Sequence, residues 1–193
     1  MKPPLLVVIG GSAGSLQTIL QLLPSLDVHL GAAIIIILHR QSHYDSVLTE
    51  LLSVKTGLVV KEAEEKDPIL PGVIYIAPAD YHLLIESDHT FSLDYSEKVN
   101  FSRPSIDVTF SAAATVYGKQ LAALLLSGAN ADGTEGLQTV KAMGGITAIH
   151  NPLHAAVDFM PRQAMNNMEV DYILETTEMA AFINRFAAAA TQG

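Results

Sequence analysis

Four short apolar runs, separated by stretches with helical spacing, constrain the fold of this chain more than any other feature of its sequence. No run alternates apolar and polar residues, so each is expected to be a strand buried on both faces of a parallel sheet. The runs are LLVVI, AAIIIIL, LAALLL and GITAI. Amphipathic helices are expected between them on three sets of residues: Leu16, Ile19, Leu20 and Leu23; Val47, Leu48, Leu51 and Leu52; and Leu137, Val140 and Met143.

This order of strands and helices predicts an α/β fold, a three-layer α/β/α sandwich with a mostly parallel sheet. The segment VIYIAPADYHLLIESDHTFSLDYS differs, because it reads as two or three short strands with turns at residues 78–80 and 87–89. It is expected to form a small β-hairpin excursion on the main domain. With 193 residues and no repeat or linker, the chain is expected to be a single domain over residues 1–193.

Composition excludes several classes of function. The chain has no cysteine, so neither a disulfide framework nor a thiolate nucleophile is possible. Its net charge of -9 and its lack of a basic cluster argue against nucleic-acid binding. The longest apolar run is far shorter than the roughly 18 residues that a membrane span needs, so no direct membrane insertion is expected. These features favour a cytoplasmic protein.

Polar side chains of three kinds directly follow the apolar runs. Ser12 follows LLVVIG, His39 follows AIIIIL, and Asp132 follows LAALLLSGANA. Since ligands of open parallel sheets gather at the carboxyl ends of the strands, these residues are candidates for one shared site. A serine, a histidine and an aspartate together are the parts of a nucleophilic relay.

The serine alone allows three interpretations. Residues Gly10 to Gly14 fit the G-x-S-x-G pattern of a nucleophile elbow, in which a tight turn exposes the hydroxyl. Ser12 is equally placed to cap the helix that starts near Gly14. A dinucleotide loop, with Arg40 receiving the 2′-phosphate of NADP, is the weakest alternative, because the G-x-G-x-x-G spacing is not met.

The order of the candidate residues also matters. An α/β-hydrolase has its elbow in mid-chain and its triad in the order Ser, Asp, His, whereas here the order is Ser12, His39, Asp132. The hydrolase order is met only if His150 or His154 replaces His39, and then no oxyanion loop remains upstream of the serine. Asp132 precedes Gly133 and is alternatively a turn or helix-capping residue.

Six motifs in the same order resemble the catalytic domain of the chemoreceptor protein-glutamate methylesterases of the CheB type. They are VVIGGSAG, IIIILHRQ, YIAPADYHLLI, RPSIDVTFSAAATVYG, LLLSGANADGTEGL and FMPRQAM, and they cover nearly the whole chain. The resemblance implies a seven-stranded parallel sheet flanked by helices. It also implies that Ser12 is the nucleophile, His39 its general base and Asp132 the group that orients His39. No metal and no organic cofactor is implied.

The implied reaction is hydrolysis of a glutamyl methyl ester on a chemoreceptor cytoplasmic helix, with glutamine deamidation as a related activity of the family. The oxyanion donors are expected among the backbone N–H groups of the glycine turns, at Gly11, Ala13, Gly14, Ala129 and Asn130. Because the domain and its glutamate-rich substrate are both acidic, local cations are expected at the mouth of the site. Four residues of the motifs are candidates for substrate binding there: Arg40, Arg103, Met160 and Arg162.

Internal pairing of Arg103 and Arg162 with Asp107, Asp158 or a helix end is the alternative to substrate binding. The chain also departs from the family pattern, with Ala13 in place of a threonine beside the nucleophile and residues 127–130 reading SGAN. It begins at the first catalytic strand, without the receiver domain that many relatives carry, so it is either a stand-alone enzyme or a fragment. A non-catalytic module that binds receptor helices is the alternative function.

Overall fold

The computed structural model describes residues 4–39 and 45–189. Seven parallel strands form one sheet in the order β3-β4-β2-β1-β7-β8-β9. Their bounds are β1 Leu5–Gly11, β2 Ala32–Leu38, β3 Val59–Glu62, β4 Val73–Ile76, β7 Leu121–Leu125, β8 Ile146–His150 and β9 Tyr172–Leu174. All four apolar runs are therefore strands of this sheet, and the predicted number and direction of strands are confirmed.

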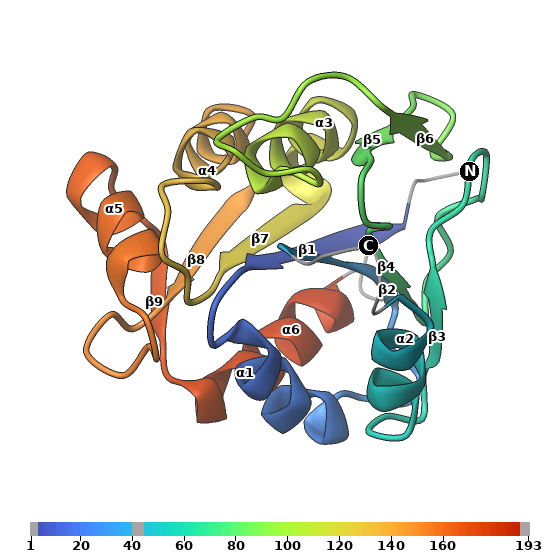
Figure 1. Cartoon of the computed structure of the whole chain (residues 1–193). Helices are drawn as coiled ribbons and strands as arrows, with labels where there is room; N and C mark the ends of the chain where they lie inside the picture. The colour runs from blue at the N-terminus through green and yellow to red at the C-terminus, as the bar shows by residue number, and fades with distance from the viewer. Residues whose placement is uncertain (1–3, 40–44, 190–193) are drawn as a thin grey trace.

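Helices cover both faces of the sheet, so the predicted three layers are confirmed. In Figure 1, α3 and α4 lie above the sheet, while α1, α2 and α6 lie below it and α5 stands at the left end. The bounds are α1 Ser15–Leu22, α2 Asp45–Ser53, α3 Ile106–Tyr117, α4 Thr134–Ala142, α5 Phe159–Asn167 and α6 Thr176–Ala188. Two short 3-10 helices follow α1 and α3, at Leu23–Ser25 and Gly118–Gln120.

Strands β1 and β2 have no polar face because each layer of helices buries one set of their side chains. Val7 and Ile9 of β1 pack into the core below the sheet, whereas Leu6 and Val8 pack into the core above it. The seven residues of β2 are all buried. The continuous apolar sequences of β1 and β2 are thus explained by burial on both faces of the sheet, and they do not indicate buried helices.

The predicted hairpin is present and separate from the main sheet. Strands β5 His82–Ile85 and β6 Phe91–Asp94 pair antiparallel, whereas the segment Val73–Ile76 that precedes them belongs to the main sheet as β4. Asp80 and His89, in the two expected turns, have positive φ angles of 64° and 63°. The hairpin packs against α3, to which residues 95–105 lead across the top of the molecule in Figure 1.

The order of the strands places a crevice at the middle of the sheet. The chain adds β2, β4 and β3 on one side of β1, and then crosses over to add β7, β8 and β9 on the other side. Such a reversal separates the loops that follow the two central strands, and ligands of doubly wound sheets bind there. Within the described part of the chain, no helix is long and apolar enough to cross a membrane.

Candidate active site

The three predicted site residues all lie at this reversal point. Ser12 follows β1, and His39 and Asp132 follow the two strands that flank β1, which are β2 and β7. The N–H of His39 donates to the carbonyl of Gly11 at 3.2 Å, which extends the β1–β2 pairing to the residue beside Ser12. Ser12 and His39 both line a cavity of about 260 Å³ whose other walls are leucine and valine side chains from α1, β2 and α2.

The imidazole of His39 has a defined orientation. Its Nε2 atom lies 2.7 Å from Oδ2 of Asp132, so Nε2 carries a proton and donates it to the carboxylate. Nδ1 is then left as the basic nitrogen. Two side chains are near it, with Ser102 Oγ at 3.4 Å and Asn130 Nδ2 at 3.5 Å. The Asn130 amide is fixed because its Oδ1 accepts the N–H of Asp132, so its NH₂ group faces Nδ1.

Asp132 is fully buried and is held as an anion by its donors. Besides His39, it accepts the backbone N–H groups of Ile106 at 2.7 Å and Asp107 at 2.9 Å, and the hydroxyl of Ser105 at 2.9 Å. Burial alone raises the pKa of this carboxyl, but the hydrogen bonds from His39 and from the start of α3 outweigh it and hold the pKa below its ordinary value. Asp132 therefore stays ionised opposite His39.

A second buried carboxyl, Asp107, lies in the first turn of α3 and binds the segment that follows Asp132. Its Oδ1 accepts the N–H groups of Gly133 at 2.9 Å and Gly136 at 2.7 Å, at the start of α4. Asp132 therefore binds the N-terminus of α3, and Asp107 binds that of α4. Burial, reinforced by the charge of Asp132, raises the pKa of Asp107 to about 7. The two carboxyls fix the two helices, and with them Asp132, relative to each other.

The turn that holds Ser12 is anchored to the loop after β7. The N–H of Ser12 donates to the carbonyl of Ser127 at 2.8 Å, and the hydroxyl of Ser15 donates to the same carbonyl at 2.6 Å. The residue that caps α1 is Gly14, in a left-handed conformation and without a side-chain capping bond. Ser12 Oγ therefore does not cap the helix, and among the described residues it is not hydrogen-bonded to His39.

The predicted oxyanion donors fall into two groups. Within residues 4–39 and 45–189, the backbone N–H groups of Ala13 and Gly14 and those of Ala129 and Asn130 have no hydrogen-bond partner, so they are free to bind an anionic oxygen. Gly11 is different, because it ends β1 and pairs with Leu38 of β2. A Cβ atom at Gly11 would lie 2.1 Å from Ser15 Oγ, so packing requires glycine there.

Met160, expected at the substrate, is instead fully buried beneath the site. Its N–H donates to the carbonyl of Gly128 at 3.0 Å, and a Cβ atom on Gly128 would lie 2.4 Å from Met160 Cε and 3.1 Å from Ser12 Cβ. Met160 therefore supports Gly128 from below, and Gly128 in turn leaves space for the Ser12 side chain.

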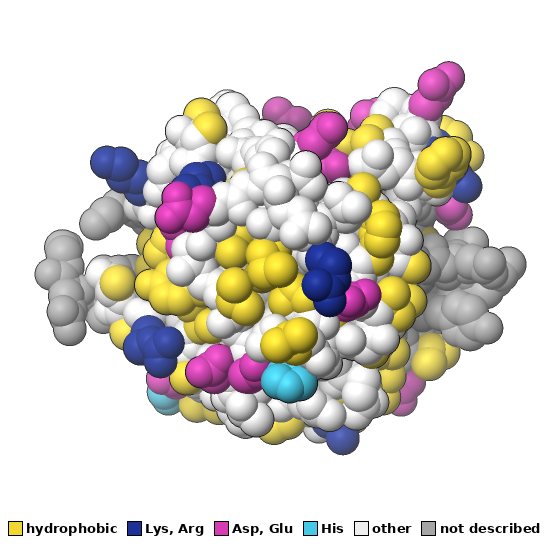
Figure 2. Space-filling view, turned by 90° about the vertical axis from the view of Figure 1, so that its left-hand side faces the viewer, with side chains coloured by type: hydrophobic (Ala, Val, Ile, Leu, Met, Phe, Trp, Pro, Cys, Tyr) yellow, Lys and Arg dark blue, Asp and Glu magenta, His cyan; other side chains and the backbone are white. Residues whose placement is uncertain are grey.

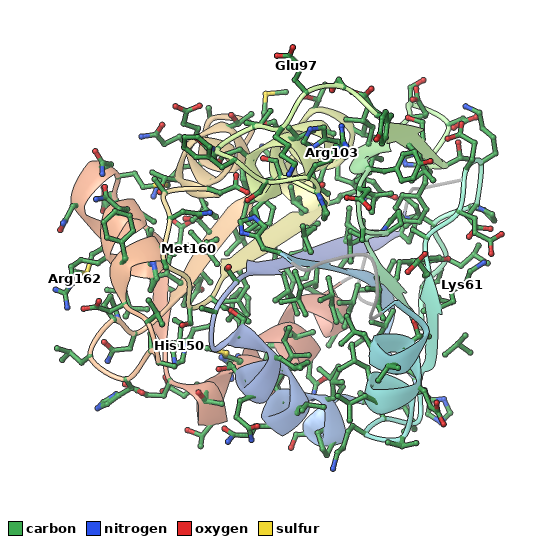
Figure 3. All side chains as sticks on the ribbon, in the orientation of Figure 1. Lys61, Glu97, Arg103, His150, Met160 and Arg162 are labelled. Carbon is green, nitrogen blue, oxygen red and sulfur yellow. The ribbon has the colours of Figure 1, made fainter. Side chains whose placement is uncertain are left out.

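The arginines that the sequence placed at the mouth of the site are not brought together. Arg103 donates to the carbonyls of Tyr95 and Ser96 and lies 3.9 Å from the centre of the Tyr95 ring. Arg162 pairs with Asp158, one turn earlier at the start of α5. Figure 3 shows Arg103 near α3 and Arg162 at the outer edge of α5. The expected convergence of these two is therefore wrong, and Arg40 lies outside the described residues.

Arg162 lies on a face with a partly apolar surface. Figure 2 looks onto this face, formed by α5 and β9, and hydrophobic side chains gather on it. The exposed ones on these elements and the loop before them are Leu153, Phe159, Met165, Tyr172 and Ile173.

The alternative histidines are engaged elsewhere. His150 Nε2 lies 3.3 Å from the hydroxyl of Thr176, and His154 Nδ1 lies 2.7 Å from Oε2 of Glu175. Asp132 therefore has His39 as its histidine partner, and the hydrolase order of the triad is not realised. In the described ranges, histidines and carboxylates form no cluster that could hold a metal ion.

Four side chains around the triad were not expected there from the sequence: Asn100, Ser102, Ser105 and Asp107, the last of which was considered only as a partner for an arginine. Asn100, Ser102 and Ser105 come from the segment between β6 and α3, whereas Asp107 lies in the first turn of α3. Asn100 Nδ2 donates to Asp107 Oδ2 at 2.7 Å. The only signal in the sequence was the RPSID motif, which contains Ser105 and Asp107. Nothing in the spacing indicated that this motif would bind an aspartate 25 or more residues away.

Comparisons with known proteins agree with this geometry. The family model described as CheB methylesterase matches residues 7–183. The putative protein-glutamate methylesterase/protein-glutamine glutaminase of Leptospira interrogans (serovar copenhageni) is 42% identical over 179 residues, which cover 93% of each chain. The corresponding protein of Thermotoga maritima is 34% identical over 88% of this chain, which spans only 50% of that relative.

A solved structure has the same fold. The crystal structure of the Thermotoga maritima CheB methylesterase catalytic domain superposes with a TM-score of 0.92 at 31% identity, over 95% of this chain and 98% of that one.

Proposed function

The chain belongs to the CheB methylesterase family, and from this we propose that it hydrolyses methyl esters of glutamate side chains on chemoreceptor helices through a Ser12-His39-Asp132 relay. The observation that carries the proposal is the buried, ionised Asp132, which fixes His39 by Nε2 and leaves Nδ1 as the basic nitrogen of a histidine that lines the same cavity as Ser12. A module that only bound receptor helices would have no use for this arrangement. The NADP alternative has no support, since the family is one of ester hydrolases.

The reaction proceeds through an acyl-enzyme. Ser12 Oγ attacks the ester carbonyl carbon as its proton passes to His39 Nδ1, and the tetrahedral intermediate then expels methoxide, which takes that proton and leaves as methanol. Water repeats the sequence on the acyl-enzyme, releasing the glutamate carboxylate and restoring Ser12. Asp132 does not accept the proton. Its lowered pKa keeps it anionic, so it stabilises the imidazolium through the Nε2–H bond.

The attack requires Ser12 Oγ to come within hydrogen-bond distance of His39 Nδ1. Ser12 and His39 line one cavity but are not hydrogen-bonded to each other within the described residues. Catalytic hydrogen bonds often tighten only when substrate is bound. The free N–H groups of Ala13 and Gly14, or of Ala129 and Asn130, stabilise the oxyanion that forms.

Deamidation of glutamine follows the same path with ammonia as the leaving group. The relatives in Leptospira interrogans and Thermotoga maritima carry both activities in their names. Of the residues proposed to touch substrate, Arg162 is accessible on α5, while Arg103 acts indirectly by holding the loop before α3. Met160 acts through Gly128.

The test is release of methanol from methylated chemoreceptor membranes. The wild-type chain is expected to release it, and Ser12→Ala and His39→Ala are each expected to lower kcat by several orders of magnitude. The double variant is expected to be little worse than either single one, because the two residues act as a unit. Multiplication of the two losses, or turnover by Ser12→Ala, would refute the relay.

A further inference from the structure

A two-residue turn beside the triad has an unusual sequence for its conformation. Val99 and Ser102 exchange both backbone hydrogen bonds, at 3.1 and 2.9 Å, around Asn100 and Phe101. Both central residues have positive φ angles, 50° for Asn100 and 63° for Phe101. Such a turn favours Asn-Gly, because the second position is strained for any residue with a bulky side chain. Phenylalanine is therefore a costly choice at this point.

Folding gains nothing from this choice. Phe101 is 97% exposed, whereas Phe91 and Phe110 are fully buried in the core. An exposed aromatic ring on a strained backbone destabilises the chain, and no contact with the described residues compensates for it. Strain of this kind persists at positions that serve a function.

The turn is attached to the catalytic residues on both sides of Phe101. Asn100 Nδ2 donates to Asp107 at 2.7 Å and lies 3.4 Å from Asp132 Oδ1. Ser102 Oγ lies 3.4 Å from His39 Nδ1, the nitrogen proposed as the base. The backbone of Phe101 is thus fixed between two residues whose side chains lie beside Asp132 and His39.

The small end of the substrate does not account for this ring. In the proposed reaction the leaving group is methanol, which has too few atoms to extend from Ser12 to a side chain in solvent. The ring is therefore expected to contact the polypeptide that carries the ester. Phe101 lines a hollow of about 560 Å³ together with Lys98 and Asn100. An ammonium group beside an apolar ring suits an acidic helix with an apolar side chain near the glutamate, and the net charge of -9 makes a local cation useful.

We propose that Phe101 is a docking residue for protein substrates, which contacts an apolar side chain of the helix that carries the esterified glutamate. This assignment rests on the proposed function, because it takes the substrate to be a protein ester. It makes Phe101 a determinant of specificity for protein over small esters. It does not make Phe101 a catalytic residue.

Two variants separate the ring from the backbone. Phe101→Gly removes the ring and relieves the positive φ, so its melting temperature is expected to equal or exceed that of the wild type. Phe101→Asn also tolerates the left-handed conformation, and it keeps a side chain without an apolar ring. For both, kcat/KM on methylated receptor is expected to fall at least about tenfold more than kcat/KM on N-acetylglutamate γ-methyl ester, a loss typical of an interface anchor. Phe101→Leu should recover much of the loss.

Val28→Ala is the matched control, since Val28 is 57% exposed and precedes β2, at the end of the sheet where the strands begin and away from the site where they end. This variant should have the wild-type kcat/KM on both substrates. Equal losses on both substrates for Phe101→Asn, or full receptor turnover by Phe101→Gly, would overturn the assignment.

A binding measurement separates failure of this assignment from failure of the proposed function. In the Ser12→Ala chain, calorimetric affinity for a methylated receptor fragment should drop at least about tenfold when Phe101→Asn is added. Unchanged affinity would overturn the docking role even if the esterase is confirmed. A drop in a chain that proves to have no esterase activity would leave the docking role standing and refute the hydrolysis alone.

Discussion

Replacement of Asp132 by asparagine is expected to cost stability as well as activity. Oδ2 accepts two donors, His39 Nε2 and the N–H of Ile106, while Oδ1 accepts the Ser105 hydroxyl and the N–H of Asp107. Whichever way the new side-chain amide is turned, its NH₂ group faces at least one backbone N–H, which is a donor and cannot act as an acceptor. One buried donor is then unsatisfied and opposed by another donor.

The size of the effect follows from that count. An unsatisfied buried donor costs about 1–3 kcal/mol, and loss of an ionised acceptor adds to this, so Asp132→Asn should lose roughly 2–4 kcal/mol of unfolding free energy. For a chain of this length that is a fall in Tm of roughly 5–15 °C. If the NH₂ group faces His39, it favours the tautomer with the proton on Nδ1, so esterase activity should fall by several orders of magnitude as well.

The assay is urea unfolding followed by circular dichroism, run beside hydrolysis of a small glutamyl ester at a temperature where the variant is folded. Asp158→Asn is the control, because Asp158 is exposed and bonds to the Arg162 side chain, and it should lose less than about 1 kcal/mol. An unfolding free energy equal to that of the wild type would show that Asp132 is not a buried acceptor for these donors. Full activity at normal stability would show that it does not orient His39.

Two further changes probe the surroundings of the triad. Since burial raises the pKa of Asp107 to about 7, its ionisation destabilises the fold: the penalty begins above the unfolded pKa of 3.8 and is complete above pH 7. The test therefore compares the unfolding free energy of Asp107→Asn with that of the wild type, measured in urea at pH 4 and at pH 7.5. The difference should shift by up to about 4 kcal/mol in favour of the variant over this range. A difference that stays constant with pH would contradict the raised pKa. Gly128→Ala would press a methyl group against Met160 and Ser12, so esterase kcat should fall at least tenfold, and the unfolding free energy should fall by about 1–3 kcal/mol. Wild-type kinetics would show that this contact does not position the serine.

The sequence was sufficient to predict the sheet and the three candidate site residues, because both follow from local patterns. Runs such as AAIIIIL are buried on two faces, and the polar residue after each run lies at the carboxyl edge of a parallel sheet whatever the helices do. Ser12, His39 and Asp132 could be found in this way, although their meeting at a reversal of strand order could not.

The residues that sequence reasoning missed act through contacts that no local pattern encodes. Asp132 reads as a cap for the helix that follows it, yet it binds the start of α3, and Asp107 of α3 binds the start of α4. Arg103 reads as a cation for substrate, yet backbone carbonyls of its own loop hold it. Each depends on how α3 and α4 pack together, which is set by the whole core.

Covalent labelling of Ser12 tests the central claim most directly. A fluorophosphonate reacts with a serine only when a neighbouring base activates it, and intact-mass and peptide analysis locate the adduct. The wild-type chain is expected to gain one adduct, on Ser12, whereas His39→Ala, folded by circular dichroism, should gain none under the same conditions. An adduct on another residue, or labelling of His39→Ala at the wild-type rate, would contradict the relay.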